Sequence, residues 1–329
     1  MMRKVVFRKF GPPEVLNVIE CDAPTPKPNQ VRIRIHATTV TAAEAAMRRG
    51  EPLWGRPMIG LTKPRKRYQT LGTELAGVVD AVGREVKRFR EGDEVFGFAG
   101  WDIGANADYL CLPEVASLSP KPSNKSFGQA AAAVDGATTA LHFLRDRANL
   151  RAGQRVLIIG AAGSIGTYAV QLAKRFGAEV TGVCGTSNVT LVRSLGADEV
   201  IDYRNEDFRE AGERWDVIFD TVGASSFTES KTVLVERGIF LPTVISIGSV
   251  FHGLWTPLAR GKRLVGGMSA TKNETLPFVT ELIKDDALQI VVDRRFPLER
   301  IQEAHRLVDT GHKKGNVIID LNNPTEVDF

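Results

Sequence analysis

The first third of the chain has the hydrophobic pattern of a β-rich domain. Apolar residues alternate with polar ones, or form β-branched runs, at residues 31–37 and 76–82, and glycine and proline separate such runs. Side chains of a strand point alternately to the two faces of a sheet, so this pattern predicts strands with one buried face. It favours a barrel-like fold for this part of the chain.

A different pattern begins after residue 120. Residues 120–126 are rich in Pro, Ser, Lys and Asn, and the alanine-rich residues 129–145 predict a buried helix. From residue 155, apolar runs alternate with amphipathic ones, which predicts parallel strands joined by crossover helices. We expect strands at 156–159, 179–184, 199–201 and 217–220, and helices at 164–176 and 188–195.

The C-terminal part is expected to return to the first domain. Its pattern predicts a helix at 276–284, a strand at 289–292, a helix at 298–308 and a strand at 316–321. The predicted fold class is therefore α/β. A β-rich domain would consist of residues 1–121 and 285–329, and a nucleotide-binding domain of residues 122–284.

The bulk composition agrees with two domains in a reducing compartment. A chain of 329 residues with 43% hydrophobic content is long enough to bury two cores. It has no apolar run of membrane-spanning length, and its first residues do not form the hydrophobic stretch of a signal peptide. Cys21, Cys111 and Cys184 are far apart in sequence, which argues against a disulfide framework or a thiolate zinc cluster. We expect a cytoplasmic protein without membrane contact.

Positive charge is concentrated at one place only. The net charge is +4, and acidic residues are interleaved with basic ones except in the run at residues 63–67, Lys-Pro-Arg-Lys-Arg. This run is short and lacks the extended basic footprint of a nucleic-acid-binding protein, so a nucleic-acid partner is not expected. It is either a solvated loop or a loop that attracts an anionic cofactor or substrate.

A glycine-rich turn between a predicted strand and a predicted helix indicates a dinucleotide site. In a parallel sheet, such a turn directs the N–H groups at the start of the helix toward a pyrophosphate, and its glycines permit close backbone approach and tight packing. The first glycine position of the G-x-G-x-x-G template holds alanine here. The expected cofactor contacts in this motif are Gly160, Ala161, Ala162, Gly163, Ser164, Ile165 and Gly166.

The end of the second strand of this unit favours NADPH. NAD sites usually carry an Asp or Glu there to bind the ribose 2′-hydroxyl, but this strand ends at Cys184 and continues with Gly185. Thr186, Ser187 and Asn188 follow and provide hydrogen-bond donors for a 2′-phosphate at the expected start of a helix. Ser187 or Asn188 could also simply cap that helix, and the two roles are compatible.

Motifs along nearly the whole chain resemble one family. These are residues 72–79 (GTELAGVV), 92–97 (GDEVFG), 161–166 and 195–198 (LGAD). Together they resemble the zinc-independent quinone oxidoreductase (zeta-crystallin-like) branch of the medium-chain dehydrogenase/reductase superfamily. The resemblance implies a GroES-like catalytic domain, a six-stranded parallel Rossmann domain, and a cleft between them where hydride passes to or from the nicotinamide.

The resemblance also assigns site residues. Thr138 resembles the threonine beside the nicotinamide, and Tyr203 the tyrosine that accompanies the adenosine phosphate. For Thr138 a purely structural role, bonding its own helix backbone, is an equal alternative. The other cofactor contacts implied by the family are Val222, Ile245, Ser246, Ile247, Lys314 and Asn316.

Two positions depart from the family pattern. Quinone reductases often carry Asn-x-x-Asp in the substrate cleft, where this chain has Thr41 and Glu44, and several relatives have an aromatic residue where this chain has Ala46. Thr41 and Glu44, with Thr138, are our candidates for the catalytic cleft. The zinc-dependent members use Cys and His where Thr41 and Thr73 stand, and threonine is not a zinc ligand, so we expect no metal.

The expected function is hydride transfer from NADPH to a quinone or to a C=C bond conjugated to a carbonyl. The cofactor carries the reacting atom, and no compact acid–base constellation is visible in the sequence. A zinc-free alcohol dehydrogenase-like enzyme and a non-catalytic NADPH-binding sensor or scaffold are the alternatives. We also expect a homodimer, because a strand near residues 262–267 should form an exposed sheet edge beside Leu254, Trp255 and Leu258.

Overall fold

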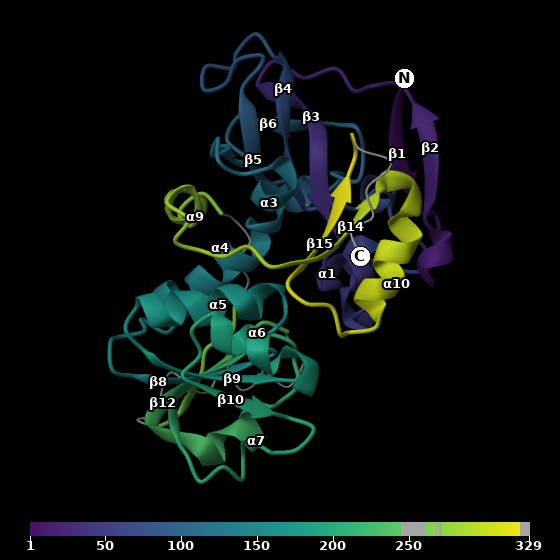
Figure 1. The fold of residues 1–329 in the computed structure, drawn as a ribbon. Helices are drawn as coiled ribbons and strands as arrows, with labels where there is room; N and C mark the ends of the chain where they lie inside the picture. The colour runs from purple at the N-terminus through teal and green to yellow at the C-terminus, as the bar shows by residue number, and fades with distance from the viewer. Residues whose placement is uncertain (245–260, 268, 270–271, 323–329) are drawn as a thin grey trace. The chain divides into compact units, whose positions relative to one another are not determined.

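The computed structural model describes residues 1–244, 261–267, 269 and 272–322. The chain divides into two compact units, one formed by Met1–Asp135 with Ala270–Phe329 and the other by Gly136–Ser269 (Figure 1). Helices α3 (Phe127–Ala132) and α9 (Leu276–Lys284), which the sequence-based boundaries put in the nucleotide-binding domain, fall in the first unit. The reason for α3 is packing, since it lies against strands β3 (Gln30–Thr39), β4 (Glu74–Val82) and β15 (Asn316–Asp320) of that unit.

The first unit is built on a seven-stranded sheet of order β14-β15-β3-β4-β5-β7, with β6 also paired to β3. A separate antiparallel pair is formed by β1 and β2, and β15 pairs antiparallel with β3, so the C-terminal tail returns to this unit. This is the β-rich domain that the alternation predicted, and it corresponds to the GroES-like domain that the resemblance implied. The strands are β1 (Met2–Val6), β2 (Asn17–Cys21), β3 (Gln30–Thr39), β4 (Glu74–Val82), β5 (Glu94–Phe98), β6 (Tyr109–Pro113), β7 (Ser117–Pro120), β14 (Val292–Pro297) and β15 (Asn316–Asp320).

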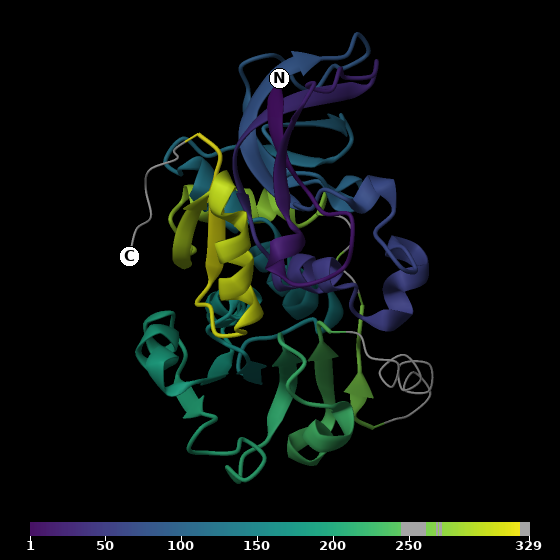
Figure 2. The same cartoon turned by 90° about the vertical axis from the view of Figure 1, so that its right-hand side faces the viewer.

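The core of this unit lies on the apolar face of β3 and β4. Val31, Ile33 and Ile35 alternate along β3 and are buried, while the intervening Arg34 is exposed. Helices α1 (Ala42–Arg49) and α10 (Ile301–Asp309) pack against each other, and α10 also lies beside β14 and β15 (Figure 2). A short helix, α2 (Arg56–Ile59), lies between α1 and β4 in the sequence.

The strand expected at residues 289–292 was misplaced. β14 begins at Val292, and Val291 precedes the ladder. The carbonyl oxygen of Val291 accepts hydrogen bonds from both the backbone N–H and the side-chain amide of Asn316, each at 3.0 Å. Pairing with β15 therefore decides where the strand begins, and the apolar run alone does not show it.

The helix expected at residues 129–145 is interrupted. The structure has α3, then α4 (Asp135–Leu141), which continues as a π-helical segment, His142–Arg147. The break follows Ala133, and the Glu74 carboxylate accepts a 2.6 Å hydrogen bond from the Asp135 N–H at the start of α4. A buried carboxylate thus provides an acceptor at the new helix N-terminus, which favours starting a second helix there.

The second unit is a six-stranded parallel sheet of order β10-β9-β8-β11-β12-β13, as the resemblance implied. Helices α5 and α6 pack on β8, β9 and β10, and α7 lies on the opposite face beside β12 (Figure 1). No helix among the described residues is long and apolar enough to span a bilayer. The elements are β8 (Arg155–Ile159), α5 (Ser164–Arg175), β9 (Glu179–Cys184), α6 (Val189–Ser194), β10 (Glu199–Asp202), β11 (Trp215–Asp220), α7 (Phe227–Ser230), β12 (Leu234–Pro242) and β13 (Arg263–Leu264).

Candidate active site

The turn between β8 and α5 has the geometry that the glycine motif predicted. Gly160 has a φ of +79°, and a Cβ atom there would lie 2.6 Å from the Val222 side chain. A Cβ atom on Gly166 would lie 2.1 Å from the Gly160 carbonyl oxygen. Gly163 is the N-cap residue of α5 and contributes no side-chain acceptor. The start of α5 is therefore suited to an external anion.

Alanine fits the position where the template has glycine. Ala161 is buried, and its N–H donates a 3.0 Å hydrogen bond to the Val183 carbonyl oxygen of β9. The neighbouring strand makes room for the methyl group, because a Cβ atom on Gly182 would approach that of Ala161 to 3.1 Å. The departure from G-x-G-x-x-G is thus compensated on β9.

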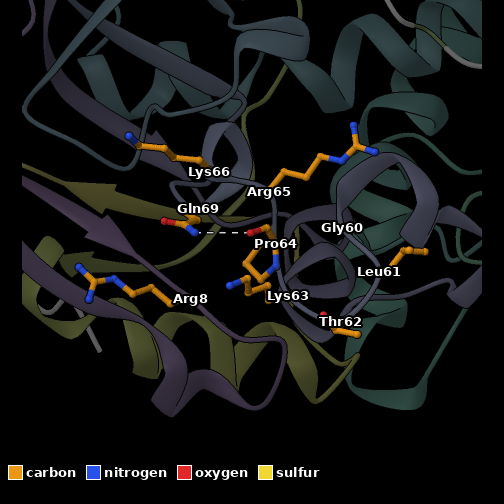
Figure 3. Close-up of a pocket in the computed structure, with 9 residues that line it drawn as sticks. All are labelled: Arg8, Gly60, Leu61, Thr62, Lys63, Pro64, Arg65, Lys66 and Gln69. Atoms are coloured by element: carbon orange, nitrogen blue, oxygen red, sulfur yellow. Dashed lines mark hydrogen bonds between the residues drawn. The ribbon is translucent and has the colours of Figure 1, made fainter.

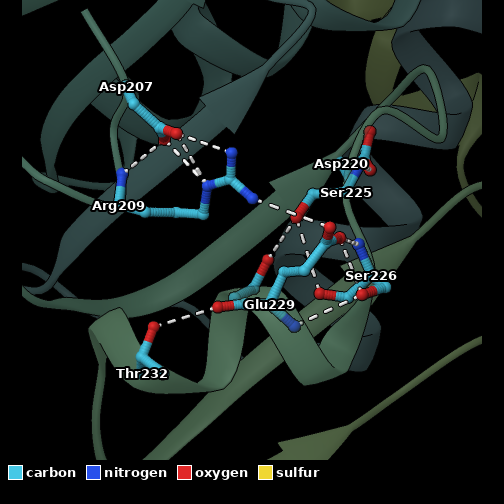
Figure 4. Close-up of polar contacts among 8 residues, drawn as sticks. Asp207, Arg209, Asp220, Ser225, Ser226, Glu229 and Thr232 are labelled. Atoms are coloured by element: carbon cyan, nitrogen blue, oxygen red, sulfur yellow. Dashed lines mark hydrogen bonds and ion pairs between the residues drawn. The ribbon is translucent and has the colours of Figure 1, made fainter.

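The loop after β11 is fixed by one buried carboxylate. Asp220 accepts hydrogen bonds from four successive backbone N–H groups, those of residues 222–225, at 2.8–3.3 Å. The following helix α7 begins with a capping box between Ser226 and Glu229, and Arg209 pairs with both Asp207 and Glu229 (Figure 4). Val222 is 53% exposed on this loop and lies over Gly160, so the loop borders the β8–α5 turn.

The ends of β9 and β10 bring together the residues expected at the adenosine end of the cofactor. A Cβ atom on Gly185 would lie 3.2 Å from the Tyr203 hydroxyl, and the Tyr203 N–H donates to the Cys184 carbonyl oxygen at 3.1 Å. Tyr203 is 52% exposed. The Thr186 hydroxyl donates a 2.6 Å hydrogen bond to the Asp202 carboxylate, and this bond lowers the pKa of Asp202.

Ser187 and Asn188, the next two residues after Thr186, differ in environment. Ser187 is exposed. Asn188 occupies the N-cap position of α6 without a side-chain capping bond, and its buried amide oxygen has no hydrogen-bond partner among the described residues. The Asn188 side chain therefore does not cap α6.

In the first unit, Thr41 and Glu44, which depart from the family pattern, belong to one local hydrogen-bond network. Thr41 is the N-cap residue of α1, and its hydroxyl accepts a 3.1 Å hydrogen bond from the Glu44 N–H. The Glu44 carboxyl accepts from the Thr73 N–H at 2.8 Å and from the Thr73 hydroxyl at 3.3 Å. Glu44 is buried, and this burial raises its pKa to about 7. Near neutral pH this group can therefore hold or release a proton.

A second buried carboxyl, Glu74, directly follows Thr73 in the chain. The Glu74 carboxylate accepts hydrogen bonds from the Thr39 hydroxyl and the Asp135 N–H, and burial together with the Asp135 charge raises its pKa. Lys272, whose side chain is 0% exposed, pairs with Asp135 at 2.8 Å. Burial lowers the pKa of Lys313 to about 8, an effect that the Glu74 and Asp293 charges oppose. Glu74, Asp135 and Lys272 thus form one chain of polar contacts in this unit.

The remaining candidates have contrasting environments. Thr138 is fully buried in α4, Lys314 is exposed with its N–H bonded to Asp293, and the Asn316 side chain donates to the Val291 carbonyl oxygen within the sheet. Ile245, Ser246 and Ile247 lie outside the described residues. Within the described part of the chain, no group of three His, Cys, Asp or Glu side chains could hold a metal ion.

Comparison with known proteins identifies the family. Residues 27–123 match the alcohol dehydrogenase GroES-like domain family, and residues 195–319 match the zinc-binding dehydrogenase family. The chloroplast envelope quinone oxidoreductase homolog of Arabidopsis thaliana is 30% identical over 336 residues, covering 97% of this chain and 98% of the relative. The chain belongs to the quinone oxidoreductase branch of the medium-chain dehydrogenase/reductase superfamily.

Solved structures of this branch have the same fold. The quinone oxidoreductase of Coxiella burnetii superposes with a TM-score of 0.87 at 30% identity, covering 98% of this chain and 99% of that one. The Escherichia coli quinone oxidoreductase complexed with NADPH has a TM-score of 0.81 at 25% identity, covering 98% and 100%. As a member of this branch, the protein is an oxidoreductase that uses a nicotinamide cofactor.

In this member of the quinone oxidoreductase branch, three carboxylates of the candidate site were not predicted from the sequence: Asp202, Glu74 and Asp220. Asp202 lies directly before Tyr203, and Glu74 lies in the GTELAGVV run, but neither was predicted as a site residue. Asp220 ends a predicted strand, and a strand-terminal Asp followed by a glycine-containing loop is a signal for backbone capping that could have been used.

Proposed function

We propose that this protein transfers hydride from NADPH to a quinone, or to an activated C=C bond conjugated to a carbonyl, without a metal. The observation that carries the proposal is the β8–α5 turn, in which Gly160 and Gly166 allow the backbone approach that a pyrophosphate needs. The names of its relatives support the acceptor class, since the Arabidopsis and Coxiella proteins are described as quinone oxidoreductases.

In this proposal, the protein's residues bind and orient, and the bound dihydronicotinamide supplies the hydride. The start of α5 binds the pyrophosphate, Thr186 and Tyr203 bind the adenosine phosphate, and Thr138 lies beside the nicotinamide. Thr41 and Glu44 belong to the substrate cleft, where Glu44 can hold a proton near neutral pH. Either acceptor needs one proton in addition to the hydride.

The test is NADPH oxidation followed at 340 nm with 9,10-phenanthrenequinone, with a simple enone, and with a primary alcohol and NADP⁺ in the reverse direction. The proposal expects turnover with the quinone or the enone. Turnover only with the alcohol would favour an alcohol dehydrogenase-like enzyme. Tight NADPH binding without turnover of any acceptor would favour a sensor or scaffold.

We propose that the reaction needs no zinc. The two positions where zinc-dependent relatives place ligands hold Thr41 and Thr73, and both side chains are engaged with the Glu44 residue of the same network. Metal analysis of the purified protein should find zinc well below one equivalent, and chelator treatment should leave activity unchanged. Stoichiometric zinc with loss of activity on chelation would refute this part of the proposal.

We also propose a homodimer formed through the edge of the six-stranded sheet. β13 lies at that edge, and an uncovered edge strand is prone to pair with another chain. Leu254, Trp255 and Leu258, which the sequence-based prediction invoked, lie outside the described residues. Light scattering at micromolar concentration should give the mass of two chains. A cytoplasmic location stays a prediction, supported by three cysteines that are all unpaired.

A further inference from the structure

The basic run at residues 63–67 forms one wall of a pocket in the first unit. The pocket has a volume of about 650 Å³ and is lined by residues 60–66, Gln69 and Arg8 (Figure 3). This volume falls in the range of small organic ligands, roughly 300–1,000 Å³, and is far more than a single ion needs. The function proposed above makes no use of this pocket.

The lining is cationic and carries no carboxylate. Arg8, Lys63, Arg65 and Lys66 all line it, and all four are exposed. Among the described residues none of the four has an ion-pair partner, although Arg65 donates a 2.8 Å hydrogen bond to the Pro57 carbonyl oxygen. Four uncompensated cations around one hollow create a positive potential that favours a ligand with several negative charges.

The wall is held by backbone contacts, so the cations are presented on a defined loop. Gly60 has a φ of +134°, and a Cβ atom there would lie 1.9 Å from the Lys63 carbonyl oxygen. The Arg65 N–H donates to the Ile59 carbonyl oxygen at 2.8 Å, and the Gln69 amide donates to the Pro64 carbonyl oxygen at 3.4 Å (Figure 3). The loop therefore closes on itself at two points.

Arg8 joins this loop through main-chain pairing. The N–H of the preceding residue, Phe7, donates to the Gln69 carbonyl oxygen at 2.9 Å. Cations from two distant parts of the sequence are thus brought to one pocket. The lining is therefore built from two segments of the chain and is not confined to the run at residues 63–67.

Apolar groups complete the lining. Leu61 is 68% exposed and lines the pocket together with Pro64. Pro64 is buried, so Leu61 is the group of the two that a ligand can cover; an inorganic anion would gain nothing from it, whereas an organic phosphate ester would cover it. A nucleic acid would need a basic surface extending well beyond this one pocket.

We propose that this pocket, formed by Arg8 and the 60–69 loop, binds the phosphate groups of an organic phosphate ester of the coenzyme A thioester class. The choice of thioester rests on the proposed function, because an enoyl thioester contains a C=C bond conjugated to a carbonyl. The phosphate-binding role rests on the pocket alone.

The test measures coenzyme A binding by calorimetry, with and without saturating NADPH. Pantetheine, which carries no phosphate, is the comparison ligand. The pocket variant is Arg65→Gln/Lys66→Gln, and its matched control is Arg84→Gln/Lys87→Gln, which removes two exposed cations of the same unit outside the pocket. We expect coenzyme A to bind in the presence of NADPH, pantetheine to bind at least tenfold more weakly, and the pocket variant alone to raise the Kd at least tenfold.

Three results would overturn the proposal. These are no coenzyme A binding to the wild type, binding that NADPH abolishes, and equal losses in the pocket and control variants. The proposal would also be wrong if the protein bound a short single-stranded DNA more tightly than coenzyme A and lost that binding in the pocket variant. Because the readout is binding, a protein that binds coenzyme A here but reduces neither quinones nor enones refutes the proposed function and leaves this site standing.

Discussion

The Thr186 hydroxyl donates a 2.6 Å hydrogen bond to the Asp202 carboxylate at the ends of β9 and β10, where we expect the adenosine end of the cofactor. Asp202 lies on β10, and the parallel register pairs it directly with Cys184 at the end of β9. Asp202 of β10 therefore places a carboxylate beside the C-terminal end of β9, although β9 itself has no Asp or Glu at that end. This carboxylate opposes a 2′-phosphate by charge and also engages one of its expected donors.

Asp202→Asn should increase the preference for NADPH. The substitution removes the negative charge and frees the Thr186 hydroxyl, while an amide can still bond to neighbouring groups. For an exposed site the gain in NADPH affinity should be roughly threefold to tenfold, with the Kd for NADH changing less than about twofold. Fluorescence titration of both cofactors measures this. Glu199→Gln, at an exposed carboxylate at the start of β10, is the control, and an equal gain there would show that the effect is one of net charge only.

Tyr203 and Gly185 test the same end of the proposed dinucleotide site. Tyr203→Phe removes a hydroxyl that can bond to the phosphate and should weaken NADPH binding by roughly tenfold, corresponding to one bond to a charged group, and should leave NADH nearly unchanged. Gly185→Asp should shift the preference toward NADH. Gly185→Ala is the matched control, because its Cβ already meets the Tyr203 hydroxyl at 3.2 Å. Equal wild-type affinities for the two cofactors would contradict the NADPH assignment.

Gly166 and Gly163 separate a packing role from a binding role within one motif. A methyl group on Gly166 would lie 2.1 Å from the Gly160 carbonyl oxygen, so Gly166→Ala should destabilise the protein by more than about 3 kcal/mol. At Gly163 the nearest atom is 3.3 Å away and φ is −77°, so Gly163→Ala should cost less than about 1 kcal/mol.

Gly163→Ala should nevertheless weaken NADPH binding about tenfold, because the new methyl group occupies the anion-facing start of α5. Thermal denaturation and cofactor titration of both variants distinguish the two roles. A Gly163→Ala protein with unchanged cofactor affinity would show that the dinucleotide does not approach this turn.

The sequence predicted those features that depend on local periodicity. The bounds of β9 and α9 agree with the predicted ranges, because the apolar pattern along one segment is enough to define each. The break between α3 and α4 was missed, since it depends on Glu74, which is distant in sequence. Asp202 was missed for the same reason, because strand register is a tertiary property that brings it beside Cys184.

Glu44 gives the protein a stability that depends on pH. Its carboxyl has one oxygen without a hydrogen-bond partner among the described residues, and burial raises its pKa to about 7 from an ordinary value of 4.5. The folded state therefore binds a proton more tightly than the unfolded chain. Stability from this group is fully present below about pH 4.5 and is lost as pH rises toward 7, by about 3 kcal/mol in total.

Glu44→Gln should remove that loss, because an amide keeps an acceptor for the Thr73 N–H and does not ionise. Urea unfolding at pH 5 and pH 8 measures the effect as the difference between variant and wild type. The variant should be close to the wild type at pH 5 and more stable by about 1–3 kcal/mol at pH 8, with the sign fixed by the raised pKa. Glu74, whose pKa is also raised, is present in both proteins, so its contribution largely cancels in the difference. A variant that is destabilised equally at both pH values would show that Glu44 is ionised in the folded protein throughout this range.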